Sequence, residues 1–172
     1  MKSKSVLVAE IIDDIRRIFQ VLTEQSKRAE NETGLTSSQL WVVKILKITS
    51  PMKVSDLAHH MYLHPATMVG LLDRLEAKGL VKRARSEQDR RVVHIDLTDQ
   101  GRDLEINSPE VVQSLLVKGL ETLIGRKLAT ISEGLAEVVA ILGVKDVPPH
   151  LILSSETNSP KRRKRVVNTS RP

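Results

Sequence analysis

The feature that most constrains the fold is a change of hydrophobic period between residues 65 and 97. The first part carries apolar residues at helical spacing: Met68, Leu71, Leu72 and Leu75. Such spacing forms one face of an α-helix. Gly79 then stands where a left-handed residue commonly ends a helix. Beyond it apolar and polar residues alternate over 92–97, the pattern of a strand with one buried face. The sequence therefore predicts a helix over 65–78 and a hairpin with strands at 80–85 and 92–97.

A shorter helix is expected just before this one, over about 54–61. The tight connection 62–64 leads to Pro65, which is favoured at the first position of a helix because its missing N–H has no partner to lose there. The order of helix, short turn, helix and hairpin is that of a winged helix-turn-helix. In such units the second helix enters the major groove of DNA.

The N-terminal part of the chain predicts two further helices. Residues 5–30 place apolar side chains at helical spacing and form a long amphipathic helix. Gly34 ends that stretch. Thr36, with Gln39 three residues later, has the spacing of a capping box, so a second helix begins there and stops at Ser50-Pro51.

The C-terminal part is also expected to be helical. Thr98 caps a helix that begins at Asp99, and Pro109 interrupts it near Ser108. Residues 110–118 resume the helical pattern, and 123–142 form a last helix with a broad aliphatic face.

The expected fold class is mainly α, a winged helix-turn-helix with a small two-stranded wing and terminal helices that form a dimerisation domain. The aliphatic faces of the first and last helices lie outside the winged unit, and a second copy of the chain would cover them. The expected domains are 1–34 (N-terminal dimerisation helix), 35–98 (winged helix-turn-helix DNA-binding domain), 99–146 (C-terminal dimerisation helices) and 147–172 (basic, disordered tail).

Composition narrows the class of protein further. Apolar residues make up 40% of the 172, but there is one Trp, one Tyr and one Phe, so the core must be aliphatic. The absence of cysteine excludes disulfides and thiolate metal sites. Apolar runs stay well below the ~18 residues that a membrane span needs, and we expect a cytoplasmic protein without a membrane partner.

The net charge of +6 is a property of the tail. Six of the 27 basic residues follow Pro160, where there are no acidic ones, so the other 21 balance the 21 acidic residues. Residues 73–91, however, hold seven basic and four acidic residues. The local excess at the predicted hairpin indicates an anionic partner more strongly than the overall charge does.

The outward positions of the helix over 65–78 and the hairpin give the candidate DNA-binding residues. The helix presents His64, Ala66, Thr67, Gly70 and Arg74, and the hairpin presents Arg83, Arg85, Arg90 and Arg91. Small side chains allow the helix to approach base edges, and arginines at the hairpin tip suit phosphates or the minor groove. For Arg83 and Arg85 a second interpretation stays open, namely surface pairing with Glu87 or Asp89.

Residues 57–101 resemble the MarR (multiple antibiotic resistance regulator) family of winged-helix transcription factors. The matching features are Leu57-Ala58, Asp73-Arg74-Leu75-Glu76, Lys78-Gly79-Leu80-Val81, Arg83, Asp89-Arg90-Arg91, Leu97-Thr98 and Gly101. The resemblance implies that Asp89 orients the wing, that Arg91 enters the minor groove and that residues 64–74 lie in the major groove. It also implies a homodimer, with an effector pocket between the dimerisation and DNA-binding parts. His64 departs from the family, which often has Ser, Asp or Asn at this cap, and contact of His64 with DNA is the alternative role.

Together these patterns predict a homodimeric, sequence-specific DNA-binding transcriptional regulator, a ligand-released repressor of a pseudo-palindromic operator. The alternative is a winged-helix module for protein–protein interaction without specific DNA binding. We expect no enzyme activity, because the sequence has no nucleophile elbow, phosphate loop or metal-ligand pattern, and we expect no cofactor.

Three smaller features each have two interpretations. His59, His60 and His64 are close together in sequence and could bind a metal, but adjacent helical residues face different ways, so we expect histidines at the surface or near DNA instead. The three aromatic residues, Phe19, Trp41 and Tyr62, either line an effector pocket or belong to the core. The KRRKR run at 161–165 is either a solvated segment or a source of sequence-independent DNA affinity.

Overall fold

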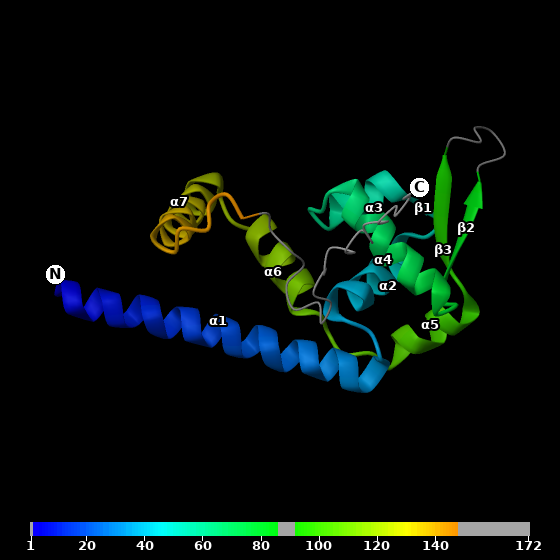
Figure 1. Cartoon of the computed structure of the whole chain (residues 1–172), viewed down its shortest axis with the longest axis horizontal. Coiled ribbons are helices and arrows are strands. Elements are labelled where there is room, and N and C mark those ends of the chain that lie inside the picture. Colours follow the sequence, from blue (N-terminus) through cyan, green and yellow to red (C-terminus); the bar gives the residue numbers. More distant parts are fainter. Residues whose placement is uncertain (1, 86–91, 148–172) are drawn as a thin grey trace, which may run out of the picture.

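The computed structural model describes residues 2–85 and 92–147, and these form seven helices and three short strands (Figure 1). The elements are α1 (Lys4–Thr33), α2 (Ser37–Thr49), β1 (Met52–Lys53), α3 (Val54–His60), α4 (Pro65–Ala77), β2 (Val81–Arg85), β3 (Val93–Leu97), α5 (Asp99–Ile106), α6 (Val112–Glu121) and α7 (Gly125–Ile141). The expected order of helices and hairpin strands is confirmed.

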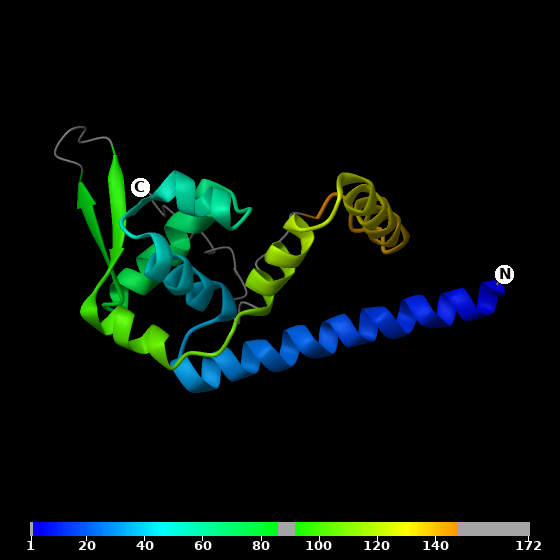
Figure 2. The ribbon, with the colours of Figure 1, turned by 180° about the vertical axis from the view of Figure 1, so that it is seen from behind.

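Helix α1 is the longest element, and most of it extends away from the body of the protein (Figure 2). The side chain of Ser3 caps its first turn, and Gly34, at a φ of 67°, ends it in the left-handed conformation that glycine adopts without steric cost. Only two of its residues, Ser26 and Ala29, are buried. The N-terminal part of its aliphatic face is therefore exposed to solvent in the single chain.

Helix α2 is the central element of the core. Its capping box is formed as expected, since Thr36 accepts from the backbone N–H of Gln39 and the side chain of Gln39 accepts from the N–H of Thr36. Trp41 is 8% exposed and lies in the main hydrophobic cluster with residues of α3, α4, β2 and β3. For Trp41 the interpretation as a core residue is confirmed.

The sheet has three strands in the order β1-β3-β2, so the expected two-stranded wing is confirmed as β2 and β3, and β1 is an additional strand that the sequence did not predict. Met52 pairs with Ile95 and Lys53 pairs with His94, which adds β1 to the edge of β3. A strand of two residues is too short to show an alternating pattern, so it exists only because β3 supplies its hydrogen bonds. We keep the name wing for the hairpin of β2 and β3.

The base of the wing is fixed by close contacts around Gly101. A Cβ added to Gly101 would lie 2.2 Å from the carbonyl oxygen of Leu80, so only glycine allows α5 to pack there. Thr98 caps α5 by accepting from the N–H of Gly101 and donates to the carbonyl of Gly79. Gly79 has a φ of 71° and follows α4 as expected.

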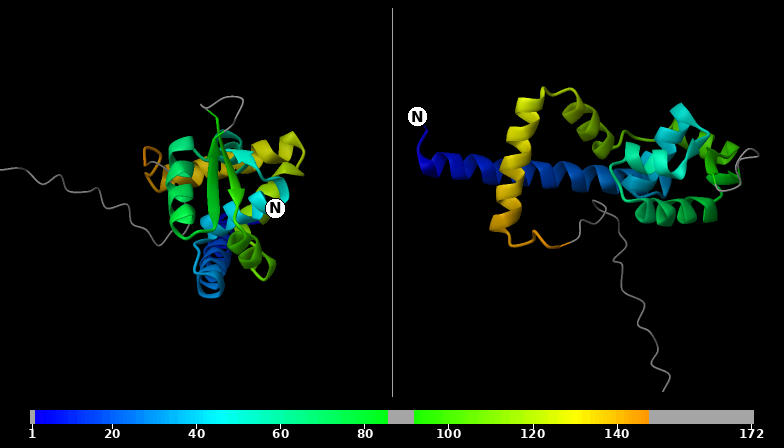
Figure 3. Two further views of the ribbon diagram at one scale, coloured as in Figure 1. Left: turned by 90° about the vertical axis from the view of Figure 1, so that its right-hand side faces the viewer. Right: turned by 90° about the horizontal axis from the view of Figure 1, so that it is seen from above.

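The C-terminal helices α6 and α7 project from the body on the same side as α1 (Figure 3). Both differ from the expected bounds by a few residues, and no residue of α7 is buried. Several of its aliphatic side chains are exposed, among them Leu128, Ile131 and Leu135. Within the described ranges, no helix has the combination of length and apolar character that crossing a membrane requires.

Candidate nucleic-acid interface

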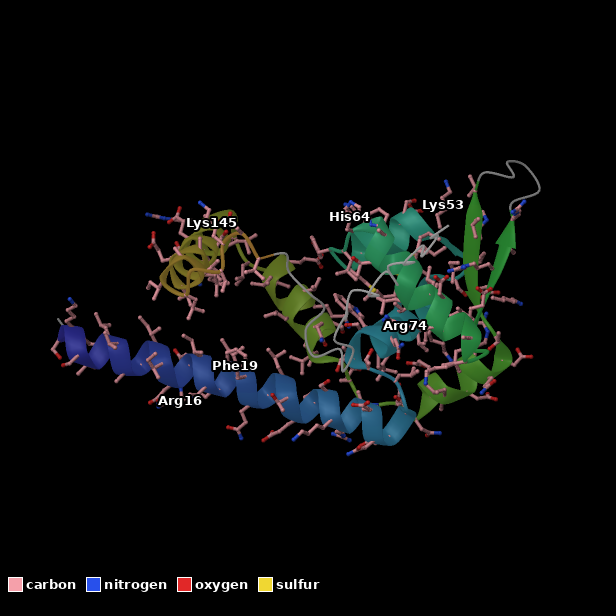
Figure 4. The ribbon with its side chains drawn as sticks, viewed as in Figure 1. Arg16, Phe19, Lys53, His64, Arg74 and Lys145 are labelled. Carbon is pink, nitrogen blue, oxygen red and sulfur yellow. The ribbon has the colours of Figure 1, made fainter. Side chains whose placement is uncertain are left out.

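The first turn of α4 is organised by His64 and Pro65. His64 is the N-cap, and its Nδ1 accepts from the backbone N–H of Ala66 at 3.3 Å. Pro65 occupies the first helical position, as expected. His64 is therefore a working cap, and because Nδ1 is engaged, only Nε2 faces solvent for contact with another molecule. Figure 4 shows His64 at the edge of the domain.

The outward face of α4 carries small side chains. Ala66 and Thr67 are exposed and Gly70 is half-buried, while the opposite face packs Met68, Leu71, Leu72 and Leu75 into the core. A Cβ added to Gly70 would meet no atom within 4 Å. Gly70 is therefore not required by the packing of the chain itself, and its outer surface is free for a partner to approach the helix backbone.

Val69 belongs to the same exposed surface, and the sequence analysis did not select it. Its side chain is 43% exposed, although valine in a helix normally suggests a core position. At about 100° per residue it lies about 60° from the outward residue Ala66 and about 60° from the buried residue Leu72, at the border between the two faces of α4. Because Val69 also stands three residues before the buried Leu72, helical spacing alone does not identify it as exposed.

Arg83 of the wing is held by two carboxylates of α4. Its Nη2 lies 2.5 Å from Oδ1 of Asp73, and its Nη1 lies 3.3 Å from Oε2 of Glu76. Of the two interpretations of Arg83, the structure therefore supports pairing within the chain. These partners are ten and seven residues earlier in the chain, on another element, whereas Glu87 and Asp89 lie outside the described residues. The ion cluster joins the wing to α4.

The other candidate arginines differ from Arg83. Arg85 is exposed at the end of β2, and no acidic residue in the described ranges pairs with it. Arg74 is half-buried on α4 and already has an interaction within the chain. Asp89, Arg90 and Arg91 lie outside the described residues, so their roles remain predictions.

A second ion cluster fixes the base of the wing through Asp96. Its carboxylate accepts from the hydroxyl of Ser50 at 2.6 Å and from Arg102 at 2.8 Å, and Lys82 lies 3.7 Å away. The hydrogen bond from Ser50, with Arg102 and Lys82, holds the pKa of Asp96 below its ordinary value despite partial burial. The cluster connects β3 to the end of α2 and to α5.

Tyr62 lies in the turn between α3 and α4 and connects that turn to α6. It has a positive φ of 52°, which is uncommon for a bulky residue. Its hydroxyl donates to Oε1 of Glu121 at 2.8 Å, and this hydrogen bond and the carboxylate charge raise the pKa of Tyr62.

An apolar cavity of about 340 Å³ lies beside this contact. Its lining consists of Tyr62, Val117, Leu120, Glu121 and Leu128. Among the three aromatic residues considered for an effector pocket, Tyr62 lines this cavity, Trp41 is in the core, and Phe19 is 65% exposed on α1. In the described part of the chain, no group of three His, Asp or Glu residues is arranged to hold a metal ion.

The chain is similar in sequence to the MarR family and to HTH-type transcriptional regulators. The model of the MarR family matches residues 35–93. The chain is 29% identical over 165 residues to the HTH-type transcriptional repressor MdtR of Bacillus subtilis, which covers 96% of this chain and 98% of MdtR. It is 35% identical over 102 residues to YfiV of the same species, named as an uncharacterized HTH-type transcriptional regulator, over 59% of this chain and 64% of YfiV.

A solved structure is also similar. The transcriptional regulator BldR from Sulfolobus solfataricus matches with a TM-score of 0.51 at 24% sequence identity, over 81% of this chain and 99% of BldR. This likeness establishes a shared fold, and it agrees with the expected winged helix-turn-helix between terminal helices.

Proposed function

From its similarities we propose that this chain is a MarR-family protein and a sequence-specific DNA-binding transcriptional regulator. The observation that supports the proposal most is the ion cluster of Arg83 with Asp73 and Glu76. The cluster links the cationic wing to α4, whose outward side chains are small, so the wing and α4 can contact one partner together. A major groove admits such a helix, and the adjacent minor groove attracts arginine.

We assign the base contacts to the N-terminal half of α4. His64, Ala66, Thr67 and Gly70 form the surface that enters the major groove, and Thr67 offers both a hydroxyl and a methyl group to base edges. The exposed side chain of Val69 adds an apolar contact that suits the methyl group of thymine. Arg74, further along the helix, is assigned to the phosphate backbone beside the groove.

The wing contacts are assigned to Arg85, Arg90 and Arg91. Arg91 enters the minor groove, Asp89 orients the wing, and Arg85 and Arg90 reach phosphates. Arg83 receives a different role from the one its sequence position suggested. Because Asp73 and Glu76 engage its guanidinium, it positions the wing against α4.

The exposed aliphatic faces of α1 and α7 support a homodimer. Ile11 is 51% exposed, Phe19 65% and Leu135 58%, and side chains of this kind rarely form an extended face on a stable monomer. We propose that 1–34 and 99–146 form the dimerisation domain and that 35–98 binds DNA. A twofold dimer presents two recognition helices about one helical turn apart on the duplex, which predicts a pseudo-palindromic site. The basic segment 147–172 adds sequence-independent affinity, and the chain acts in the cytoplasm.

Regulation is proposed to be repression that a small ligand releases. MdtR is named as a repressor, and the cavity beside Tyr62 offers an apolar site with two polar groups. Since Tyr62 lies in the turn that precedes α4, a ligand that displaces its hydroxyl from Glu121 moves α4 relative to α6. The two recognition helices then no longer match their half-sites.

The proposal is tested by the affinity of the full chain for a duplex taken from the DNA upstream of its own gene. A scrambled duplex of the same length and composition serves as the control. We expect tight, salt-dependent binding of the upstream duplex and weaker binding of the control. Absence of binding to either duplex at low salt would favour the protein-docking alternative.

A further inference from the structure

An open, polar hollow of about 550 Å³ lies between the end of α2, β1, α3 and β3. We call it the histidine hollow, and its lining residues are Thr49, Pro51, Met52, Lys53, Asp56, His59, His60 and His94. Three of the chain's five histidines meet here, although they come from elements more than thirty residues apart in sequence. None of the assigned base or wing contacts uses them.

The pairing of β1 with β3 brings Lys53 and His94 together. They are directly opposite each other in the antiparallel register, and side chains at such positions point to the same side of a sheet. Helix α3 begins immediately after Lys53 and places His59 and His60 in its last turn. The ring of His59 also stacks on Tyr62, with centroids 6.5 Å apart.

The histidine hollow borders the proposed DNA-binding surface. His94 pairs with Ala84, the neighbour of Arg85, so it lies at the outer end of the wing. His60 is four residues before the N-cap of α4. Figure 4 shows Lys53 and His64 at the same edge of the domain, the edge where β2 ends.

The charges in the histidine hollow depend on protonation. With neutral imidazoles, Lys53 and Asp56 offset each other, whereas protonated imidazoles make the hollow cationic. Asp96 is on the same face of β3 as His94, but Ser50, Arg102 and Lys82 already engage its carboxylate. Within the described ranges, no side chain or backbone group forms a hydrogen bond with a ring nitrogen of His60 or His94.

We propose that the histidine hollow binds a backbone phosphate of the duplex beside the groove that α4 reads, and that protonation of His60 and His94 strengthens this contact. The inference rests on the proposed function. A phosphate oxygen accepts charge-assisted hydrogen bonds from Lys53 and from protonated imidazoles. Because the bound phosphate favours the charged imidazoles, binding of the duplex takes up protons near neutral pH.

His64 is not part of the histidine hollow. Its Nδ1 accepts the N–H of Ala66 as the cap of α4, and the residue is assigned to the surface that enters the major groove. The substitutions that test the hollow therefore leave His64 unchanged.

The first experiment measures duplex affinity of the full chain by fluorescence anisotropy at about pH 6 and about pH 8, each over a range of salt. One phosphate contact changes the slope of log affinity against log salt by about 0.9, so the wild-type slope should be steeper at the lower pH by about that amount. In H60Q/H94Q the affinity at about pH 6 divided by the affinity at about pH 8 should be smaller than in the wild type, because the variant cannot form the pH-dependent phosphate contact. G119A, which changes no titratable group and lies in α6 away from the proposed DNA-binding surface, is the control and should keep the wild-type ratio.

The second experiment measures proton uptake on duplex binding at about pH 6.5, by calorimetry in two buffers of different ionisation enthalpy. Wild type should take up protons, and H60Q/H94Q should take up fewer. An unchanged pH ratio together with unchanged proton uptake in H60Q/H94Q, with circular dichroism showing an intact fold, would overturn the inference alone. Failure of the wild type to bind any duplex at either pH would contradict the proposed function itself.

A third arm distinguishes the source of the phosphate group. Inorganic phosphate is added to the free protein while the histidine ring signals are followed by NMR. Small changes in the histidine chemical shifts that saturate only at high phosphate concentration would show weak binding of free phosphate and would support the duplex as the occupant. Tight binding of free phosphate, with loss of duplex affinity, would assign the hollow to a soluble anion and would overturn the proposal.

Discussion

Arg83 of the wing donates to Asp73 of α4 across 2.5 Å, and this contact joins the two parts of the proposed DNA-binding surface. A wing held against its recognition helix meets the duplex without first being ordered, which lowers the entropic cost of binding. Glu76, at 3.3 Å, completes the cluster.

Arg83 and Arg85 provide a matched pair of substitutions on one strand, because each removes one positive charge from β2. R83A should lower the free energy of unfolding by up to about 1 kcal/mol, a modest effect because the carboxylates are largely exposed. R85A should leave the unfolding free energy within about 0.5 kcal/mol of wild type but reduce the salt slope of duplex binding by about one. Urea unfolding and anisotropy measure the two effects. Equal loss of stability in both variants would contradict the positioning role of Arg83.

Gly70 should show opposite effects on stability and on binding. Alanine is favoured over glycine inside a helix by about 1 kcal/mol, and the added Cβ meets no atom within 4 Å, so G70A should raise the unfolding free energy. The same methyl group stands between α4 and the bases and should weaken duplex binding. G119A in α6, where a Cβ also meets nothing within 4 Å, should stabilise the protein similarly without a change in affinity. A G70A protein that binds the duplex as well as wild type does would remove Gly70 from the interface.

Ser50 should support stability only while Asp96 is ionised. The pKa of Asp96 is lowered in the folded protein, chiefly by the Ser50 hydroxyl. The stabilisation is therefore present above the ordinary aspartate value of about 3.9 and is lost as pH falls through the lower folded value. S50A should cost about 1 kcal/mol near neutral pH, and the difference from wild type should narrow between about pH 5 and about pH 2. Urea unfolding of both proteins across this pH range measures the difference in unfolding free energy. A difference that does not change with pH would contradict the prediction.

Tyr62 is the only tyrosine in the chain, so its ionisation can be followed directly by near-ultraviolet absorbance. The hydrogen bond to Glu121 and the carboxylate charge raise the pKa of Tyr62 above its ordinary value. E121Q removes the carboxylate charge and should shift the titration to lower pH. An identical titration in both proteins would show that the turn before α4 is not tied to α6 in solution.

Much of the fold follows from local signals in the sequence. The capping box at Thr36, Pro65 at the start of α4, the left-handed glycine after α4 and the cap at Thr98 each act within a few residues, and all were predicted correctly. The wing strands followed from alternation. The third strand did not, because β1 depends on a partner more than forty residues away.

The candidate site was predictable in outline, and its internal contacts were not. The exposed small residues of α4 could be selected from helical spacing. The pairing of Arg83 with Asp73 and the meeting of His60 with His94 arise from tertiary packing, since neither pair shares an element. Val69 was not predicted, because it lies at the border between the outward and the buried face of α4, where helical spacing does not decide its exposure.

The most direct test of the central claim is the mass of the complex between the full chain and its upstream duplex at low ionic strength, measured by sedimentation equilibrium. The account predicts a dimer in the free protein and two chains on each duplex that carries one pseudo-palindromic site. A chain that stays monomeric and sediments independently of every duplex offered would contradict it.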